Sequence, residues 1–198
     1  MSDADADKPV FQRLDQTAGY PYSLGEYARR FAWAWVWKLL IRPSPPRAFG
    51  WRRFWLRQFG AKLAPTSRFF ASARVRHPWL LEMGEWAAVG EAVNIYNLGP
   101  VTIGDHSVVS QHVHLCAGTH DHTKPNLPLI RPPIHIGRGV WVCADAFIGP
   151  GVTIADNALV GARAVVVKDV PEATIVAGNP AREIGPRQME AASKCRFD

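Results

Sequence analysis

A six-residue hydrophobic period runs through the second half of the chain. An aliphatic residue recurs at every sixth position from Ile136, and a small or short residue stands four places after most of them. The aliphatic series is Ile136, Val142, Ile148, Ile154, Val160 and Val166. A period of six matches neither the 3.6-residue repeat of a helix nor the alternation of an ordinary strand. It predicts short strands joined by tight corners, as in a solenoid.

The same period is present earlier in the chain. It passes through Ile103, Val109 and Leu115. A weaker series consists of Leu63, Phe69, Val75, Leu81, Ala87 and Val93. Three hexapeptides make one triangular coil, and stacked coils pair their backbone groups while burying a column of aliphatic side chains. A sandwich of irregular strands would not keep this period, so we predict a mainly β fold, a left-handed parallel β-helix.

The period also predicts the organisation of the chain. It is lost after Leu115, where a polar, proline-containing loop of about 117–133 leaves the prism. The β-helix domain is expected to span 63–187, and a C-terminal tail 188–198. Residues 1–62 form a separate, basic and Trp-rich segment that we expect to be partly helical.

Charge and tryptophan are concentrated near the start of the chain. The net charge is +6, and residues 27–81 contain twelve Lys or Arg, no Asp or Glu, and six of the eight Trp. Helices are expected at 24–42, ended by Pro43, and at about 49–59. They either cover the open end of the prism, which we favour, or lie on an anionic membrane surface through 27–62. The two roles are compatible.

Composition excludes several classes of protein. No apolar run is long enough to cross a membrane, and residues 1–7 are acidic and polar rather than a signal sequence. The three Cys residues show no pairing motif, which is typical of a reducing compartment. We therefore expect a cytoplasmic protein, possible peripheral membrane contact aside. Positive charge alone, without a recognition motif, does not predict a nucleic-acid partner.

Several motifs carry a family resemblance. They are Val101-Thr102-Ile103-Gly104-Asp105-His106, Thr119-His120-Asp121-His122, Val165-Val166-Val167-Lys168-Asp169-Val170-Pro171 and Ala177-Gly178-Asn179-Pro180-Ala181-Arg182. Through them, residues 93–187 resemble the hexapeptide-repeat acyltransferases, especially galactoside and maltose O-acetyltransferases. With Gly50-Trp51-Arg52-Arg53 and Phe59-Gly60-Ala61-Lys62, the chain is most similar to the colanic acid biosynthesis branch. The resemblance implies a homotrimer with active sites between subunits, acetyl coenzyme A as donor and a sugar hydroxyl of a surface glycan as acceptor.

The catalytic base is expected in the extruded loop. A hydroxyl is a poor nucleophile until its proton is removed, and histidine does this near neutral pH. His120 opens the loop and matches the position of the family's catalytic histidine. We expect direct attack of the hydroxyl on the thioester, with backbone N–H groups stabilising the oxyanion and no metal.

The resemblance also implies the residues around this base. Asn97, Asp121 and His122 would contact the acceptor, although Asn97 could instead serve a corner turn. Five residues would contact coenzyme A: Trp141, Ala144, Ala162, Lys168 and Arg182. Cys143-Ala144 departs from the glycine usual in the family, and for Lys168 and Arg182 a solvated surface position is the alternative.

Two other functions remain open from the sequence. The prism could be a non-catalytic trimeric scaffold, because fold alone does not establish activity. A metal-dependent hydrase is less favoured: His112-x-His114 and His120-x-His122 invite a metal, but no two histidines have the spacing of those enzymes. The sequence names neither the sugar and its hydroxyl nor the carrier of the acceptor, and it leaves a longer acyl group or an amine acceptor open.

Overall fold

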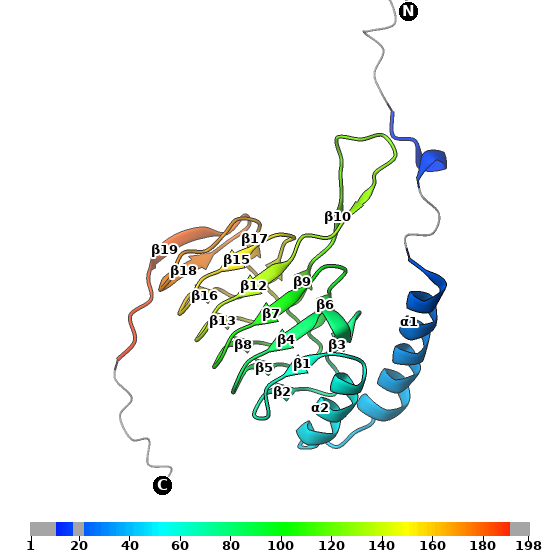
Figure 1. The fold of residues 1–198 in the computed structure, drawn as a ribbon. Helices are drawn as coiled ribbons and strands as arrows, with labels where there is room; N and C mark the ends of the chain where they lie inside the picture. The colour runs from blue at the N-terminus through cyan, green and yellow to red at the C-terminus, as the bar shows by residue number, and fades with distance from the viewer. Residues whose placement is uncertain (1–10, 18–21, 191–198) are drawn as a thin grey trace, which may run out of the picture.

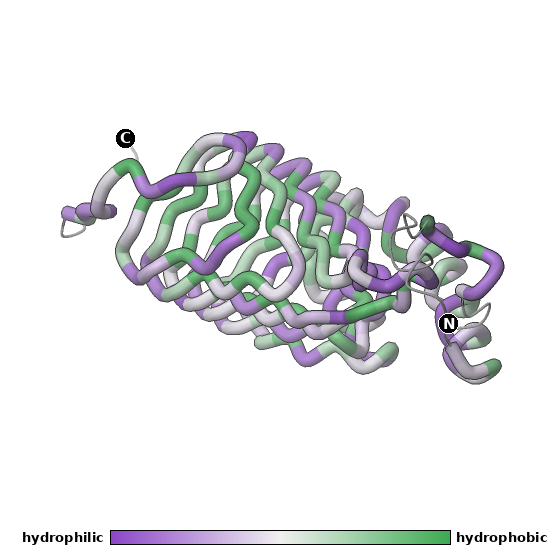
Figure 2. Tube along the Cα trace, turned by 90° about the horizontal axis from the view of Figure 1, so that it is seen from above, coloured by the Kyte–Doolittle hydropathy of each residue, from purple (hydrophilic) through white to green (hydrophobic). Residues whose placement is uncertain are grey.

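The predicted parallel β-helix is present. The computed structural model describes residues 11–17 and 22–190, so the segment 1–7 and most of the expected tail lie outside the described residues. Short strands stack into three parallel sheets that form the faces of a prism (Figure 1). Hydrophobic positions recur in register from coil to coil (Figure 2). Among the described residues, no helix combines the length and apolarity needed to cross a bilayer.

Each coil contributes one strand to each sheet. The first sheet contains β1 (Lys62–Leu63), β4 (Leu81–Met83), β7 (Val101–Ile103), β12 (Ile134–Ile136) and β15 (Thr153–Ile154). The second contains β2 (Arg68–Phe69), β5 (Ala88–Val89), β8 (Val108–Val109), β13 (Trp141–Val142), β16 (Leu159–Val160), β18 (Thr174–Ala177) and the antiparallel β19 (Arg182–Pro186). The third contains β3 (Arg74–Val75), β6 (Asn94–Tyr96), β9 (His114–Cys116), β14 (Phe147–Ile148) and β17 (Val165–Val166).

The core column follows the predicted period, with one correction in the early coils. After Val75 the next residue in the column is Met83, which pairs with Leu63 below and Ile103 above. Leu81, Ala87 and Val93 are buried but stand two residues before the column positions. The 3-10 turn η4 (Pro78–Leu80) lengthens the corner. Register therefore shifts by 20 residues between early coils (Lys62 to Glu82) and by 18 later (His135 to Thr153).

Two helices cover the end of the prism at the first coil. Helix α1 (Leu24–Val36) begins at a capping box in which Ser23 and Glu26 bond each other's backbone N–H. It continues as a π-helical turn, η3 (Trp37–Ile41), before α2 (Phe49–Gln58). Helix α2 lies against β1 and β2, and α1 stands beside it (Figure 1) and reaches β3 through Trp33. A 3-10 turn, η2 (Leu14–Gln16), precedes both helices. Trp33, Ile41 and Leu56 are buried in the same core as the prism.

The helices supply hydrogen-bond donors that the first coil lacks. In the second coil, five carbonyls accept backbone N–H groups from the first: those of Met83, Ala87, Val89, Val93 and Ile95. The equivalent carbonyls of the first coil have no coil beneath them. Side chains from the helices donate to all five: Arg57 to Leu63, Arg53 to Ser67, Arg52 to Phe69, Trp37 to Ala73 and Trp33 to Val75. Arg and the Trp indole donate and cannot accept, which suits this edge.

These contacts give the basic, Trp-rich segment a structural role as a cap. The buried guanidinium of Arg52 shows how completely it is used: Nε bonds Phe69 O at 2.5 Å, and the other nitrogens bond Ser44 Oγ, Pro45 O and Pro46 O. Burial lowers the pKa of this side chain. Its partners are carbonyl and hydroxyl oxygens, so Arg52 needs no acidic residue beside it. This explains how the segment can contain many Arg residues and no Asp or Glu.

We expect Trp33→Phe to destabilise the protein by about 1–3 kcal/mol, because the buried carbonyl of Val75 would lose its donor. Trp35→Phe is the matched control. Its side chain is 47% exposed, against 3% for Trp33, so its effect should stay within about 0.5 kcal/mol. Urea unfolding followed by circular dichroism measures both, and equal losses in the two variants would contradict a role for the carbonyl bond.

Candidate active site

A β-hairpin carries His120 away from the prism. It leaves the corner between the third and first sheets, after β9, and returns at β12 (Figure 1). Strands β10 (Thr119–His120) and β11 (Leu129–Ile130) pair antiparallel, with His120 opposite Leu129. The N-terminal segment lies on the loop, since Arg13 N–H donates to Pro125 O and Thr17 Oγ1 to Asn126 O.

The ring of His120 is held in one orientation. Nδ1 lies 2.6 Å from the carbonyl oxygen of Leu127, at the turn of the hairpin. A carbonyl can only accept, so this contact assigns the proton to Nδ1 and leaves Nε2 as the basic nitrogen. The side chain is exposed. The geometry therefore presents an oriented proton acceptor at the surface.

His120 lines a cleft of about 540 Å³. The other walls come from three parts of the chain. They are Thr17, Tyr22 and Arg30 from the N-terminal segment, Tyr96 and Leu98 from the end of β6 and the corner that follows it, and Asn126, Leu127, Pro128, Leu129 and Arg131 from the hairpin. Tyr22 and the hairpin thus enclose space directly beside the ring of His120. Of the residues on this wall, the sequence predicted only His120; the two Tyr and two Arg side chains were not predicted.

The two neighbours of His120 in the hairpin have different environments. Asp121 Oδ1 accepts the N–H and the hydroxyl of Thr123, and Lys124 lies 3.4 Å from Oδ2. These bonds, Thr123 first, hold the pKa of Asp121 below its usual value. Asp121 thereby stabilises the turn and does not line the cleft. The side chain of His122 is exposed, and it too lies outside the cleft wall.

Asn97 has a different role from the expected acceptor contact. It is fully buried, its Oδ1 accepts the N–H groups of Arg76 and His77, and its Nδ2 donates to His77 O at 2.6 Å. In return His77 Nδ1 donates to Asn97 O, which leaves Nε2 as an unprotonated and buried nitrogen without a partner among the described residues. Burial, above all, lowers the pKa of His77 to about 4. The Asn97–His77 pair fixes the corner behind the cleft.

The outer face of the third sheet carries two polar residues, Asn94 and Tyr96, that the sequence analysis did not place at the site. Asn94 and Tyr96 both point outward from β6, and Asn94 Nδ2 lies 3.4 Å from His114 Nε2 on β9. The ring of His114 also meets Phe147 edge-on, and burial lowers its pKa. Strand alternation alone places Asn94 and Tyr96 on one face, so this signal was available.

The expected coenzyme A residues lie elsewhere on the prism. Trp141 is on the second sheet, half-exposed, with Nε1 donating to Ser110 Oγ. Ala144 and Ala162 occupy adjacent coils at the corner between the second and third sheets. Arg182 extends on β19 beside that region, whereas Lys168 lies at the corner from which the hairpin leaves. Within one chain the structure does not bring Trp141, Ala144 and Ala162 together with His120. The third sheet lies between the corner at Ala144 and Ala162 and the corner from which the hairpin leaves.

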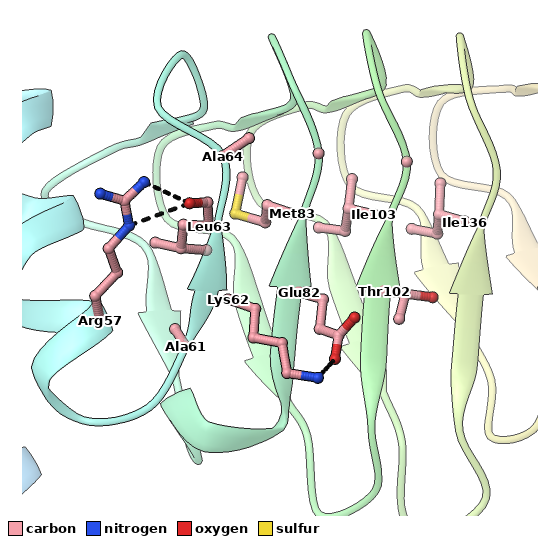
Figure 3. Close-up of a pocket in the computed structure, with 12 residues that line it drawn as sticks. Arg57, Ala61, Lys62, Leu63, Ala64, Glu82, Met83, Thr102, Ile103 and Ile136 are labelled. Carbon is pink, nitrogen blue, oxygen red and sulfur yellow. Dashed lines mark hydrogen bonds and ion pairs between the residues drawn. The ribbon is translucent and has the colours of Figure 1, made fainter.

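Another hollow, of about 610 Å³, follows the first sheet (Figure 3). The ion pair of Lys62 with Glu82 and the side chain of Thr102 lie on one side, and aliphatic core residues and Arg57 on the other (Figure 3). None of the predicted site residues lines it. Among the described residues, no three His, Cys, Asp or Glu side chains gather as a metal site.

Comparisons with known proteins agree with this architecture. Residues 133–168 match the family model "Bacterial transferase hexapeptide (six repeats)". Over 155 residues, 78% of this chain and 85% of the relative, the chain is 43% identical to a protein of Escherichia coli (strain K12) that is named "Putative colanic acid biosynthesis acetyltransferase WcaF". It is also 39% identical over 87 residues to the galactoside O-acetyltransferase of the same strain.

Two solved structures of acetyltransferases have the same fold. Galactoside acetyltransferase in complex with coenzyme A superposes with a TM-score of 0.76 at 25% identity, covering 85% of this chain and 86% of that one. A hexapeptide-repeat acetyltransferase of Vibrio cholerae O1 biovar eltor, complexed with acetyl coenzyme A, gives 0.76 at 26% identity, covering 89% and 96%.

Proposed function

The chain belongs to the hexapeptide-repeat acetyltransferase family, and from that premise we propose that it moves the acetyl group of acetyl coenzyme A to a sugar hydroxyl in surface-glycan synthesis. The observation that carries the proposal is the orientation of His120. Its Nδ1–H is engaged by Leu127 O, so Nε2 is free to accept a proton beside a cleft large enough for a sugar. The names of the relatives support the donor and the glycan.

The proposed reaction is a direct transfer. His120 Nε2 takes the proton of the acceptor hydroxyl as its oxygen attacks the thioester carbonyl. When the tetrahedral intermediate collapses, the new C–O bond stays and the C–S bond breaks. The leaving thiolate then takes the proton that His120 had accepted. The products are the O-acetyl sugar and coenzyme A. No acyl-enzyme is required, so no second nucleophile is assigned.

The distribution of site residues supports assembly of more than one chain. His120 stands at one corner of the prism, and the proposed coenzyme A contacts Trp141, Ala144 and Ala162 stand beyond the third sheet. A symmetric homotrimer would bring the hairpin of one subunit to the groove of the next. Arg182 and Lys168 would then meet the phosphates of coenzyme A, and Asp121 and His122 would border the acceptor from the hairpin.

We expect His120→Ala to lower thiol release from acetyl coenzyme A, with a panel of acceptor sugars, by roughly 10²–10⁴-fold, which is the usual contribution of a general base. His135→Ala, which changes an exposed histidine on β12 with no role assigned in the site, is the control and should keep most activity. Coenzyme A affinity should be unchanged in both. Equal rates in wild type and His120→Ala would exclude this base. A protein that neither releases thiol nor binds coenzyme A would favour the scaffold alternative.

Subunit mixing tests the shared site. His120→Ala and Ala162→Trp, which fills the groove, should each be inactive alone. Co-expressed in equal amounts, they should recover about a quarter of the wild-type activity, because one interface type combines an intact loop with an intact groove. Absence of recovery, with trimers confirmed by light scattering, would place both residues in one subunit's site.

We also propose that the helical cap touches an anionic bilayer. One side of α1 and η3 faces away from the prism and carries Leu24, Phe31, Trp35 and Leu39, which are 47–88% exposed. Lys38 and Arg42 flank these side chains, with Lys38 Nζ 5.6 Å from the ring of Trp35. Exposed apolar residues bordered by cations are typical of helices that lie in a membrane interface.

Wild-type protein should therefore sediment with vesicles that contain phosphatidylglycerol, and less with pure phosphatidylcholine. The double change Phe31→Ser with Leu39→Ser should abolish sedimentation without lowering the melting temperature. Ile184→Ser removes an equally exposed apolar side chain on β19 and serves as the control. Retained sedimentation of the double variant would contradict contact through α1 and η3.

A further inference from the structure

Residues 11–17, which we call the strap, lie on the turn of the extruded hairpin (Figure 1). The backbone N–H of Arg13 donates to Pro125 O at 2.8 Å, and the hydroxyl of Thr17 donates to Asn126 O at 3.0 Å. Thr17 and Asn126 are 109 positions apart in the sequence, and both are half-buried. The strap therefore constrains two adjacent residues of the turn from outside the hairpin.

The peptide unit between Asn126 and Leu127 is held at both ends. Its oxygen accepts the hydroxyl hydrogen of Thr17, and its nitrogen, which belongs to Leu127, donates to Lys124 O at 3.0 Å. A peptide unit is planar and rigid, so hydrogen bonds on its two sides fix its orientation. The bond to Lys124 lies within the turn, whereas the bond from Thr17 comes from a distant segment. Thr17 is thus an external support of this peptide unit.

Leu127 needs this support, because its backbone conformation is unfavourable. Its φ is +43°, in the left-handed region that is sterically costly for a side chain such as Leu. The eight other described non-glycine residues with positive φ stand at corners of the prism, and each donates its N–H to the preceding coil. Conformations of this kind persist only where the surroundings fix them. In the hairpin, the held peptide unit replaces the support that a neighbouring coil gives elsewhere.

The conformation of Leu127 decides the hydrogen bond of His120. Its φ sets the direction of the Leu127 carbonyl relative to the preceding peptide unit, and that carbonyl oxygen lies 2.6 Å from His120 Nδ1. A peptide unit released by Thr17 can rotate, which lets φ return to the negative range and turns the carbonyl away from the ring. Nδ1 then loses its acceptor, and the ring proton is free to move to Nε2. A neutral ring with the proton on Nε2 cannot accept a proton there.

We infer that Thr17 is a positioning residue for the proposed base, because its bond to the turn keeps the ring proton of His120 on Nδ1. The inference rests on the proposed acetyl transfer and adds to it a residue outside the hairpin. Thr17 also borders the cleft, but its hydroxyl has a single hydrogen, which it donates to the turn. The protonation of His120 therefore depends on a segment that precedes the first helix of the cap.

Proton–nitrogen correlation NMR of the full chain with isotope-labelled histidine reads the tautomer directly. Loss of a signal in His120→Ala identifies the ring of His120. Wild type should show its proton on Nδ1. Thr17→Val keeps the shape of the side chain but cannot donate, so a second set of ring signals with the proton on Nε2 should appear. Thr17→Ser keeps the hydroxyl and should restore the wild-type spectrum.

Kinetics connect the tautomer to the reaction. Thr17→Val should lower kcat for thiol release from acetyl coenzyme A roughly 3- to 10-fold, as expected for one lost hydrogen bond, and should leave the KM for acetyl coenzyme A unchanged. Thr17→Ser should stay close to wild type. Thr153→Val, which changes an exposed threonine on the first sheet, is the matched control and should alter neither kcat nor the spectrum of His120.

Two results would overturn the inference. One is a wild-type tautomer together with wild-type kcat in Thr17→Val. The other is a lower kcat in Thr17→Val with the proton still on Nδ1, which would mean that Thr17 acts on the acceptor itself. In both cases, loss of activity in His120→Ala would leave the proposed function standing. A tautomer change in a protein that releases no thiol with any sugar would instead confirm the contact and contradict the acetyl transfer.

Discussion

The structure depends on how the backbone carbonyls at the open end of a parallel β-helix, beside its first coil, find hydrogen-bond donors. Every coil passes N–H groups to the carbonyls of the next, so the first coil keeps a set of carbonyls with no backbone partner. Buried carbonyls without donors cost free energy comparable to a lost hydrogen bond. Here three Arg and two Trp side chains provide the donors. This requirement explains a stretch of sequence that charge alone would assign to an external anionic partner.

The same cap positions the candidate site. Because Trp33 and Trp37 bond the first coil, the axis of α1 is fixed against the third sheet. The N-terminal turns of α1 then carry Arg30 to the cleft, and the segment before it brings Tyr22 to the same wall. The hairpin with His120 meets them from the opposite side. Helix α1 therefore both stabilises one end of the prism and shapes the cleft.

Much of the fold was predictable because its information is local and periodic. From Ile136 to Val166 each hexapeptide has the same burial pattern, so the period is unbroken. The early coils were placed two residues out of phase after Val75, because the turn η4 has its own buried residues that imitate the period. The donors of the cap were not predictable. Which Trp bonds a carbonyl and which faces solvent depends on the docking of α1, and both kinds occur within 33–37.

For the candidate site the sequence predicts a chemistry, which stays a prediction, and it says little about the geometry. A motif located His120, but only the hairpin reveals that Leu127 O selects its tautomer. Asn97 follows a strand whose outward residues are Asn94 and Tyr96, and its burial arises from a corner that sequence spacing does not describe. The arginines of the cleft come from segments about a hundred residues apart, which no local pattern connects.

The cap also bears on how proteins of this shape can change in length. Its five donors match one coil's carbonyls, and every later coil presents the same set to the coil before it. Duplication of an 18-residue coil between β15 and β17 would leave both ends of the stack, and the hairpin with its cleft, as they are. The first coil has no such freedom, because its spacing must stay in step with side chains on two helices. Growth by duplication is thus confined to the far half of the prism, where it would change the coils that carry the proposed coenzyme A contacts and leave the cap unchanged.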